Sequence, residues 1–274
     1  MSGKSRHIAV DGIKTHYLEA GSGSPLILIH GGGAGADAHG NWSPCIPRFA
    51  ERHRVLALDM VGFGDTDKPD PASFEYSQSA RNRHLLGFLE ALELDSAVLV
   101  GNSMGGCTAL GVAMEAPQRV RALVLMGSAG LNAELSPAIR TILSYQPTLE
   151  NMRTIIETLT GDGFVIDDEL VRYRYELTQQ PGAMAAYGAT MKWIGEQGGL
   201  FYPEEAIARV KTPTLVVGGS DDQVVPKELA WRFHELLENS WLHVIPHCGH
   251  WAMIEQREEF TRLVELWCEL RGVA

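Results

Sequence analysis

A serine held between two glycines, directly after an apolar run, is the feature that most limits how this 274-residue chain can fold. Residues 96–100 have the composition of a buried strand, residues 101–105 read Gly-Asn-Ser-Met-Gly, and mostly small residues follow over 106–110. The pattern predicts a strand, a sharp turn and a helix, because the glycines let the backbone turn tightly and expose the serine oxygen at the strand end. The turn also places Ser103 beside a helix amino terminus, where the positive end of the helix dipole favours an anion. Ser103 is therefore a candidate nucleophile.

A carboxylate is expected after such a serine in the chain, and two neighbouring aspartates are available. The apolar run from Pro213 to Val217 indicates a buried strand, which breaks at two glycines before Asp221 and Asp222. We favour Asp222 as the acid, because the spacing from Gly219 to Pro226 puts it past the glycine turn and before the next helix. Asp221 stays as the alternative.

A histidine should come after the acid, at another strand end. Residues 241–245 indicate a strand that breaks into Pro-His-Cys-Gly-His-Trp over 246–251. His250, between a glycine and a tryptophan, is the predicted base, with His247 and His243 as competitors. His243 lies within the strand alternation, which is typical of a surface or packed side chain. A lone histidine is more often structural, but the order serine, aspartate, histidine, each at a strand end, favours catalysis.

A glycine-rich loop follows an earlier buried strand at residues 25–29 and reads His-Gly-Gly-Gly-Ala-Gly over 30–35. Consecutive glycines leave backbone N–H groups uncovered, so this loop can supply one donor of an oxyanion hole. We predict the N–H groups of Gly32 and Met104 as the two donors. The alternative is a flexible loop without a role.

The same loop also matches a dinucleotide fingerprint loosely, through Gly31, Gly33 and Ala36. Such a match is weak by itself. Residues 37–44 contain a proline and several polar residues and do not continue the amphipathic helix that a pyrophosphate site needs. We therefore predict no cofactor.

The remaining apolar segments alternate between strand and helix patterns. They are a hairpin of 7–10 and 13–18 around Asp11-Gly12, a strand at 55–59, a helix at 77–94 and a strand at 120–126. The alternation predicts an α/β fold with a mostly parallel sheet and helices on both faces.

The alternation stops after residue 130. Apolar residues then recur at helical spacing over 137–145, 149–160, 167–179 and 183–195, and no buried strand is indicated before residue 213. We predict an α/β core of residues 1–130 and 203–274, with residues 131–202 inserted as a helical lid. A lid over a serine at the sheet edge would make a closed, largely apolar pocket suited to an aromatic or alkyl substrate.

Composition limits the partners and the compartment. The net charge is −11 without a basic cluster, which argues against nucleic acid and anionic membrane surfaces, and no apolar run reaches the roughly 18 residues of a membrane span. Four cysteines lie far apart without metal-type spacing, and the first residues are polar and unlike a secretion signal. We expect reduced thiols, no metal site and a cytoplasmic location.

Five segments together resemble the meta-cleavage product hydrolases, α/β-hydrolases that cut a carbon–carbon bond in ring-opened aromatic compounds. The segments are His-Gly-Gly-Gly-Ala-Gly at 30–35, Gly-Asn-Ser-Met-Gly-Gly at 101–106, Leu-Met-Gly-Ser-Ala-Gly-Leu at 125–131, Gly-Ser-Asp-Asp-Gln-Val-Val-Pro at 219–226 and His-Cys-Gly-His-Trp at 247–251. Residues 161–168 and 193–202 are most similar to the carbazole-pathway branch of the family, so the resemblance spans nearly the whole chain.

The resemblance implies a 2-hydroxy-6-oxohexa-2,4-dienoate substrate with a 6-aryl or 6-alkyl group, a homo-oligomer and no cofactor. The products would be 2-hydroxypenta-2,4-dienoate and an aryl or alkyl acid. It implies that the dienol first becomes a ketone, which Ser103 attacks after activation by His250, while Asp222 orients and balances the imidazolium.

The resemblance also implies residues that bind the substrate. The arginine at the carboxylate end corresponds to Arg174, a planar cation that suits a carboxylate and the neighbouring oxygen. Arg172 on the same predicted helix competes with it, and a solvated helix face is the third possibility. The other positions implied are Gly33, Asn41, Asn102 and Trp251, and for the last three turn formation and packing are alternative roles.

Two further functions stay open for the same residues. One is a carboxylesterase or lactonase with the same three catalytic groups. The other is a ligand-binding protein on a hydrolase scaffold. Dehalogenases and epoxide hydrolases are disfavoured, since they need a carboxylate where Ser103 stands.

Overall fold

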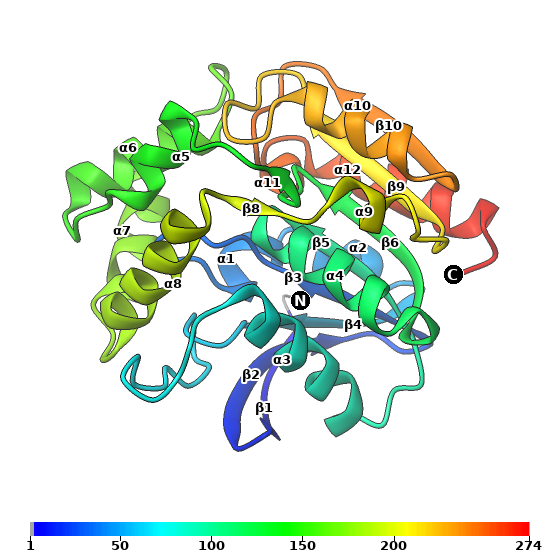
Figure 1. The fold of residues 1–274 in the computed structure, drawn as a ribbon, viewed down its shortest axis with the longest axis horizontal. Coiled ribbons are helices and arrows are strands. Elements are labelled where there is room, and N and C mark those ends of the chain that lie inside the picture. The colour runs from blue at the N-terminus through cyan, green and yellow to red at the C-terminus, as the bar shows by residue number, and fades with distance from the viewer. Residues whose placement is uncertain (1–2, 274) are drawn as a thin grey trace.

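An eight-stranded sheet forms the centre of the protein, in a computed structural model that describes residues 3–273 (Figure 1). Its strand order is β1-β2-β4-β3-β5-β6-β9-β10. The strands are β1 (Lys4–Val10), β2 (Ile13–Ala20), β3 (Ser24–Ile29), β4 (His53–Leu58), β5 (Ala97–Asn102), β6 (Val120–Met126), β9 (Thr214–Gly219) and β10 (Ser240–Ile245). Strands β1, β2 and β4 pair antiparallel, and the other neighbours pair parallel. The predicted α/β fold is confirmed.

The central strands are mostly apolar and are buried, because helices cover both of their faces (Figure 1). Strands β5 and β9 are buried at every residue. At the edge of the sheet, Asp11 and Gly12 both have positive φ, 48° and 83°, as the predicted tight hairpin between β1 and β2 requires.

The helices that cover the sheet form two groups. Figure 1 shows α3, α4 and α10 on one face and α2 and α12 on the other. The helix bounds are α1 (Ala38–Trp42), α2 (Ile46–Phe49), α3 (Gln78–Ala91), α4 (Met104–Glu115), α5 (Pro137–Leu143), α6 (Leu149–Leu159), α7 (Asp168–Thr178), α8 (Ala183–Gln197), α9 (Glu204–Ile207), α10 (Lys227–Leu236), α11 (Ala252–Glu255) and α12 (Arg257–Leu270).

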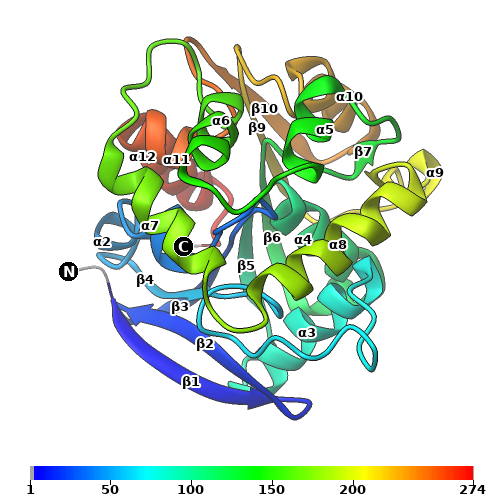
Figure 2. The same ribbon diagram turned by 90° about the vertical axis from the view of Figure 1, so that its left-hand side faces the viewer.

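Helices α5 to α8 lie between β6 and β9 in the chain and gather beyond one end of the sheet (Figure 2). The four helices predicted for this region are confirmed, and their ends agree with prediction to within two residues. The expectation of no strand here was wrong, because β7 (Leu131–Asn132) and β8 (Leu200–Phe201) pair antiparallel. Two-residue strands are too short to leave a periodic pattern.

The four cysteines are unpaired and buried. Within residues 3–273, no helix combines the length and the apolar composition needed to cross a bilayer.

Candidate active site

Ser103 occupies the sharp turn between β5 and α4, where its φ is 56° and its ψ is −121°. This backbone conformation is uncommon for a residue with a side chain and is found where the surrounding structure enforces it. The flanking glycines explain how the turn fits. A Cβ atom at Gly105 would lie 2.3 Å from the Ile29 carbonyl oxygen, and one at Gly101 would lie 2.5 Å from the Gly105 carbonyl oxygen. Larger residues would therefore push α4 away from β3 and β5.

A buried histidine and aspartate pair lies next to this turn. The His250 Nδ1 and Asp222 Oδ2 atoms are 2.7 Å apart, and both side chains are at most 2% exposed. The other Asp222 oxygen accepts hydrogen bonds from the N–H groups of Val224 and Val225, each at 2.8 Å. Asp222 is thus held as a hydrogen-bond acceptor facing the imidazole. A Cβ atom at Gly127 would lie 2.9 Å from His250 Nδ1, so only glycine fits behind the pair.

The alternative candidates for the acid and the base lie away from this pair. Asp221 is exposed and accepts a hydrogen bond from the Ser220 hydroxyl. His247 is exposed, and His243 pairs on the surface with Glu259 at 2.9 Å. The structure therefore brings Asp222 and His250 together and leaves Asp221, His247 and His243 outside the site.

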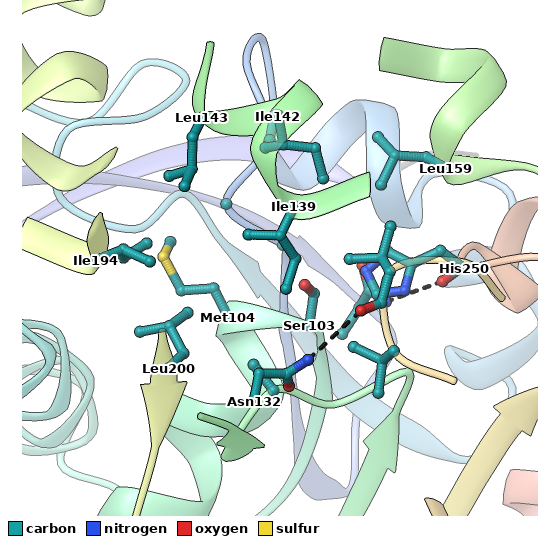
Figure 3. Close-up of a pocket in the computed structure, with 18 of the residues that line it drawn as sticks. Ser103, Met104, Asn132, Ile139, Ile142, Leu143, Leu159, Ile194, Leu200 and His250 are labelled. Atoms are coloured by element: carbon teal, nitrogen blue, oxygen red, sulfur yellow. Dashed lines mark hydrogen bonds between the residues drawn. The ribbon is translucent and has the colours of Figure 1, made fainter. Parts of the chain in front are cut away.

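Ser103 and His250 line one cavity beneath the helices α5 to α8, with about 700 Å³ of empty space when its opening to solvent is included (Figure 3). Sequence reasoning missed most of the apolar wall, which is formed by Ile139, Ile142, Leu143, Leu159, Ile194, Leu200, Val224 and Val225. On α5 the spacing of residues 139, 142 and 143 marks one helix face and could have identified its part of this wall.

The glycine-rich loop lies directly against the elbow. A Cβ atom at Gly32 would lie 2.8 Å from the Met104 sulfur, and one at Gly31 would lie 3.4 Å from the Ser103 Cβ. Neither the Gly32 nor the Met104 N–H donates a hydrogen bond to any acceptor within residues 3–273. Buried His30 holds the loop, since its Nδ1 donates to the Gly31 carbonyl at 2.6 Å and its Nε2 accepts from a backbone N–H. The arrangement leaves two backbone donors free beside Ser103.

One arginine enters the cavity from α7. The Arg174 side chain is buried, donates to the Ala34 carbonyl at 2.8 Å and has its guanidinium carbon 4.8 Å from the centre of the Trp251 ring. Its Nε has no hydrogen-bond partner in the described part of the chain. Burial lowers the pKa of Arg174 to about 10 against the opposing charge of Asp37, so it stays protonated at neutral pH. Arg172 is exposed on the opposite side of the helix.

The other predicted binding residues line the same cavity. Asn41 is buried and its Oδ1 has no partner among residues 3–273. The Asn102 nitrogen donates to the carbonyls of Met126 and His250 at 3.1 and 3.2 Å, so it ties the elbow to the histidine loop. A Cβ atom at Gly33 would lie 3.3 Å from an Arg174 nitrogen.

A second buried carboxylate, Asp37, joins the core to α7. It accepts hydrogen bonds from the Tyr173 hydroxyl at 2.5 Å and the Gly40 N–H at 2.7 Å. Burial, and then the charge of Asp59, raise the pKa of Asp37 to about 6. The protonated acid is thus favoured in the folded protein relative to the unfolded chain.

We expect Asp37→Asn to remove a loss in the free energy of unfolding that the parent protein suffers as the pH rises. With a folded pKa above the unfolded value, the contribution of Asp37 to stability is full below about pH 4 and is lost as the pH rises through about 6. Relative to the parent protein, the variant should therefore gain about 2 kcal/mol in free energy of unfolding between pH 4 and pH 7.5. Urea unfolding at four pH values measures the gain, and a difference independent of pH would contradict the assignment.

The elbow, the buried histidine and aspartate, and the free loop amides on a mostly parallel sheet are the features of an α/β-hydrolase. A family model described as the alpha/beta hydrolase fold matches residues 24–256, and the chain belongs to that family. Within it, the chain belongs with the meta-cleavage product hydrolases, as the sequence resemblance predicted.

Three relatives support this placement. The 2-hydroxy-6-oxo-6-(2'-aminophenyl)hexa-2,4-dienoic acid hydrolase of Metapseudomonas resinovorans is 53% identical over 93% of this chain and 88% of its own length. A crystal structure of a serine hydrolase involved in carbazole degradation has a TM-score of 0.90 and 49% identity, covering 97% of this chain and 99% of that one. A meta-cleavage product hydrolase from Pseudomonas fluorescens IP01 has a TM-score of 0.90 and 37% identity, covering 96% and 97%.

Proposed function

We propose that the protein hydrolyses the C5–C6 bond of 2-hydroxy-6-oxohexa-2,4-dienoates that carry an aryl or alkyl group at C6. The products are 2-hydroxypenta-2,4-dienoate and the corresponding carboxylic acid. One observation carries the proposal: a single cavity holds the candidate nucleophile and base, a buried arginine, and an apolar wall. Such a cavity suits a substrate with a carboxylate at one end, a ketone in the middle and an apolar group at the other.

The chemistry requires an electron sink, because carbon is a far poorer leaving group than an alkoxide. Conversion of the dienol to its keto form supplies a conjugated carbonyl that accepts the electron pair when C5–C6 breaks. Ser103, deprotonated by His250, attacks the C6 ketone, and Asp222 stabilises the resulting imidazolium. The N–H groups of Gly32 and Met104 hold the oxyanion. The imidazolium gives its proton to the departing dienolate, which becomes 2-hydroxypenta-2,4-dienoate, and water then hydrolyses the acyl-enzyme.

Arg174 binds the substrate carboxylate in this proposal. A buried guanidinium with an unpartnered Nε forms charge-assisted hydrogen bonds that are stronger than those of a solvated one. Gly33 leaves room for it, Trp251 stacks against it, and Asn41 and Asn102 line the same cavity. Residues 131–202 act as the lid that keeps water out.

We expect Arg174→Ala to lower kcat/KM for a dienoate by about 10²- to 10³-fold, since the carboxylate loses a buried ionic partner. Turnover of an uncharged p-nitrophenyl ester should fall less than about 5-fold, because it has no carboxylate to bind. Arg172→Ala, at an exposed neighbouring position, is the matched control and should change neither substrate. Equal losses for both substrates in Arg174→Ala would refute the contact.

The function is tested by mixing the purified protein with 6-phenyl and 6-methyl dienoates and following the loss of the yellow chromophore together with the release of acid. Repeated turnover of either dienoate is expected. Turnover of p-nitrophenyl esters far above that of dienoates would favour an esterase or lactonase instead. Binding without repeated turnover of any substrate would favour a ligand-binding protein.

The proposal also covers the compartment and the oligomeric state of the protein. We place the protein in the cytoplasm, supported by four buried unpaired thiols, and we expect a homo-oligomer from the family resemblance. Light scattering of the purified protein tests the second property.

A further inference from the structure

A glutamate outside the cavity holds the backbone on both sides of His250. Glu255, the last residue of α11, accepts hydrogen bonds from the Gly249 N–H at 2.9 Å and from the Trp251 N–H at 3.0 Å, one at each carboxylate oxygen. Such hydrogen bonds to a charged group are stronger than those between neutral groups. Glu255 is not among the described residues that line the cavity, so it acts on the site only through the histidine loop, residues 247–251.

The same carboxylate also binds the proposed lid. The Oε2 atom that accepts from Gly249 accepts from the Gly161 N–H as well, at 2.8 Å, just after the end of α6. A further hydrogen bond joins the two segments directly, because the His250 N–H donates to the Leu159 carbonyl at 3.0 Å. The Leu159 side chain lines the cavity on the same side of Ser103 as His250 (Figure 3). The end of α6 and the histidine loop are therefore joined through backbone groups.

The two segments lie too close together for side chains to separate them. A Cβ atom at Gly249 would lie 2.4 Å from the Gly161 nitrogen and 2.5 Å from the Thr160 carbonyl carbon. One at Gly161 would lie 3.1 Å from the Gly249 nitrogen and 3.3 Å from Glu255 Oε2. Because backbone packs directly on backbone here, a displacement of the end of α6 also displaces the histidine loop.

Three buried N–H groups depend on this one carboxylate. Gly161, Gly249 and Trp251 are buried, and within residues 3–273 none of their N–H groups has another acceptor. A buried N–H group without an acceptor is unfavourable, so without the Glu255 carboxylate the segments that carry these groups would shift.

We propose that Glu255 is a positioning residue for the candidate base His250. Its carboxylate fixes the backbone on both sides of the imidazole and makes the imidazole position depend on the end of α6. The imidazole must lie within hydrogen-bond reach of Ser103 to take its proton, and a misplacement of about 1 Å costs about 10²-fold in rate. The inference rests on one part of the proposed function, that Ser103 and His250 act together, and not on the identity of the substrate.

The first experiment measures the reactivity of Ser103 in each folded molecule. A fluorophosphonate forms a bond between its phosphorus and the oxygen of an activated serine, the histidine takes the serine proton, and fluoride leaves. Mass spectrometry of the intact protein follows this labelling over time. The first-order rate constant at a fixed reagent concentration does not depend on how much of the sample is folded, so a loss of stability alone leaves it unchanged.

We expect Glu255→Gln to lower this rate constant by about 10- to 100-fold. The amide keeps the size of the carboxylate but has one acceptor oxygen, and its nitrogen would face an N–H group. For a dienoate, kcat should fall by a similar factor, whereas KM should change by less than about 3-fold because no residue of the cavity wall is altered.

Glu258→Gln is the matched control, since it makes the same chemical change at an exposed residue of the next helix and should keep the rate constant within about 2-fold. A rate constant for Glu255→Gln within about 3-fold of the parent would overturn the proposal. A parent protein that reacts with the fluorophosphonate but cleaves no dienoate would instead overturn the proposed function and leave this comparison valid.

A second pair of variants tests the dependence on α6 and keeps Glu255, so it gives a result even if Glu255→Gln does not fold. Gly161→Ala places a methyl group against the histidine loop, which forces a shift of a few tenths of an ångström. We expect the rate constant to fall by about 3- to 10-fold. Gly163→Ala is the control, because a Cβ atom there has no neighbour within 4 Å in the described part of the chain. Equal rate constants for the two alanine variants would contradict the dependence.

Discussion

Ser103→Ala is expected to lower the rate of carbon–carbon bond cleavage by about 10⁴- to 10⁶-fold, the loss seen when a serine hydrolase loses its nucleophile. The substitution removes one oxygen at a position whose backbone is held by the packing of Gly101 and Gly105, so the fold should persist. Ketonisation of the substrate should continue, because the proposed nucleophile takes no part in it. Rapid-mixing absorbance follows the ketone, and chromatography of the carboxylic acid product follows cleavage.

The two readouts separate chemistry from damage to the site. An unchanged thermal midpoint together with substrate binding shows that the cavity is intact. Cleavage at the parental rate would mean that Ser103 is not the nucleophile. Loss of ketonisation together with cleavage would place Ser103 in the earlier step as well.

Asp222→Asn is expected to lower kcat by about 10⁴-fold, the second-largest effect. The amide has nearly the shape of the carboxylate, and one of its atoms can still accept from the N–H groups of Val224 and Val225. The atom facing His250 then becomes an N–H₂ group, which cannot accept from Nδ1. The imidazole is left in the wrong tautomer to take a proton from Ser103, and its positive charge is not balanced.

Asp221→Asn is the matched control, because it makes the same chemical change one residue away. Asp221 is exposed and lies outside the cavity, so its variant should retain kcat within about 2-fold. The comparison is a steady-state assay of both variants on one dienoate. A large loss in Asp221→Asn, or a small one in Asp222→Asn, would contradict the assignment of the acid.

Local signals predicted much of the fold. Three features depend only on residues that are close together in the sequence, so their patterns are visible there. They are the Gly-x-Ser-x-Gly turn, the Asp11-Gly12 hairpin and the helices α5 to α8. Strands β7 and β8 were missed because each has only two residues and exists through pairing across some 70 residues of chain.

The sequence by itself determined which chemical groups are present and in what order: a serine at a glycine turn, aspartates past one strand end, histidines past another, and arginines on a lid helix. Only the tertiary structure decided between near neighbours. Asp222 faces His250, whereas Asp221 is exposed to solvent. Likewise the Arg174 side chain lines the cavity, whereas the Arg172 side chain is exposed to solvent. The physical reason is that burial depends on what packs against a segment from distant parts of the chain. A one- or two-residue step turns a side chain from the core to water without changing the local pattern.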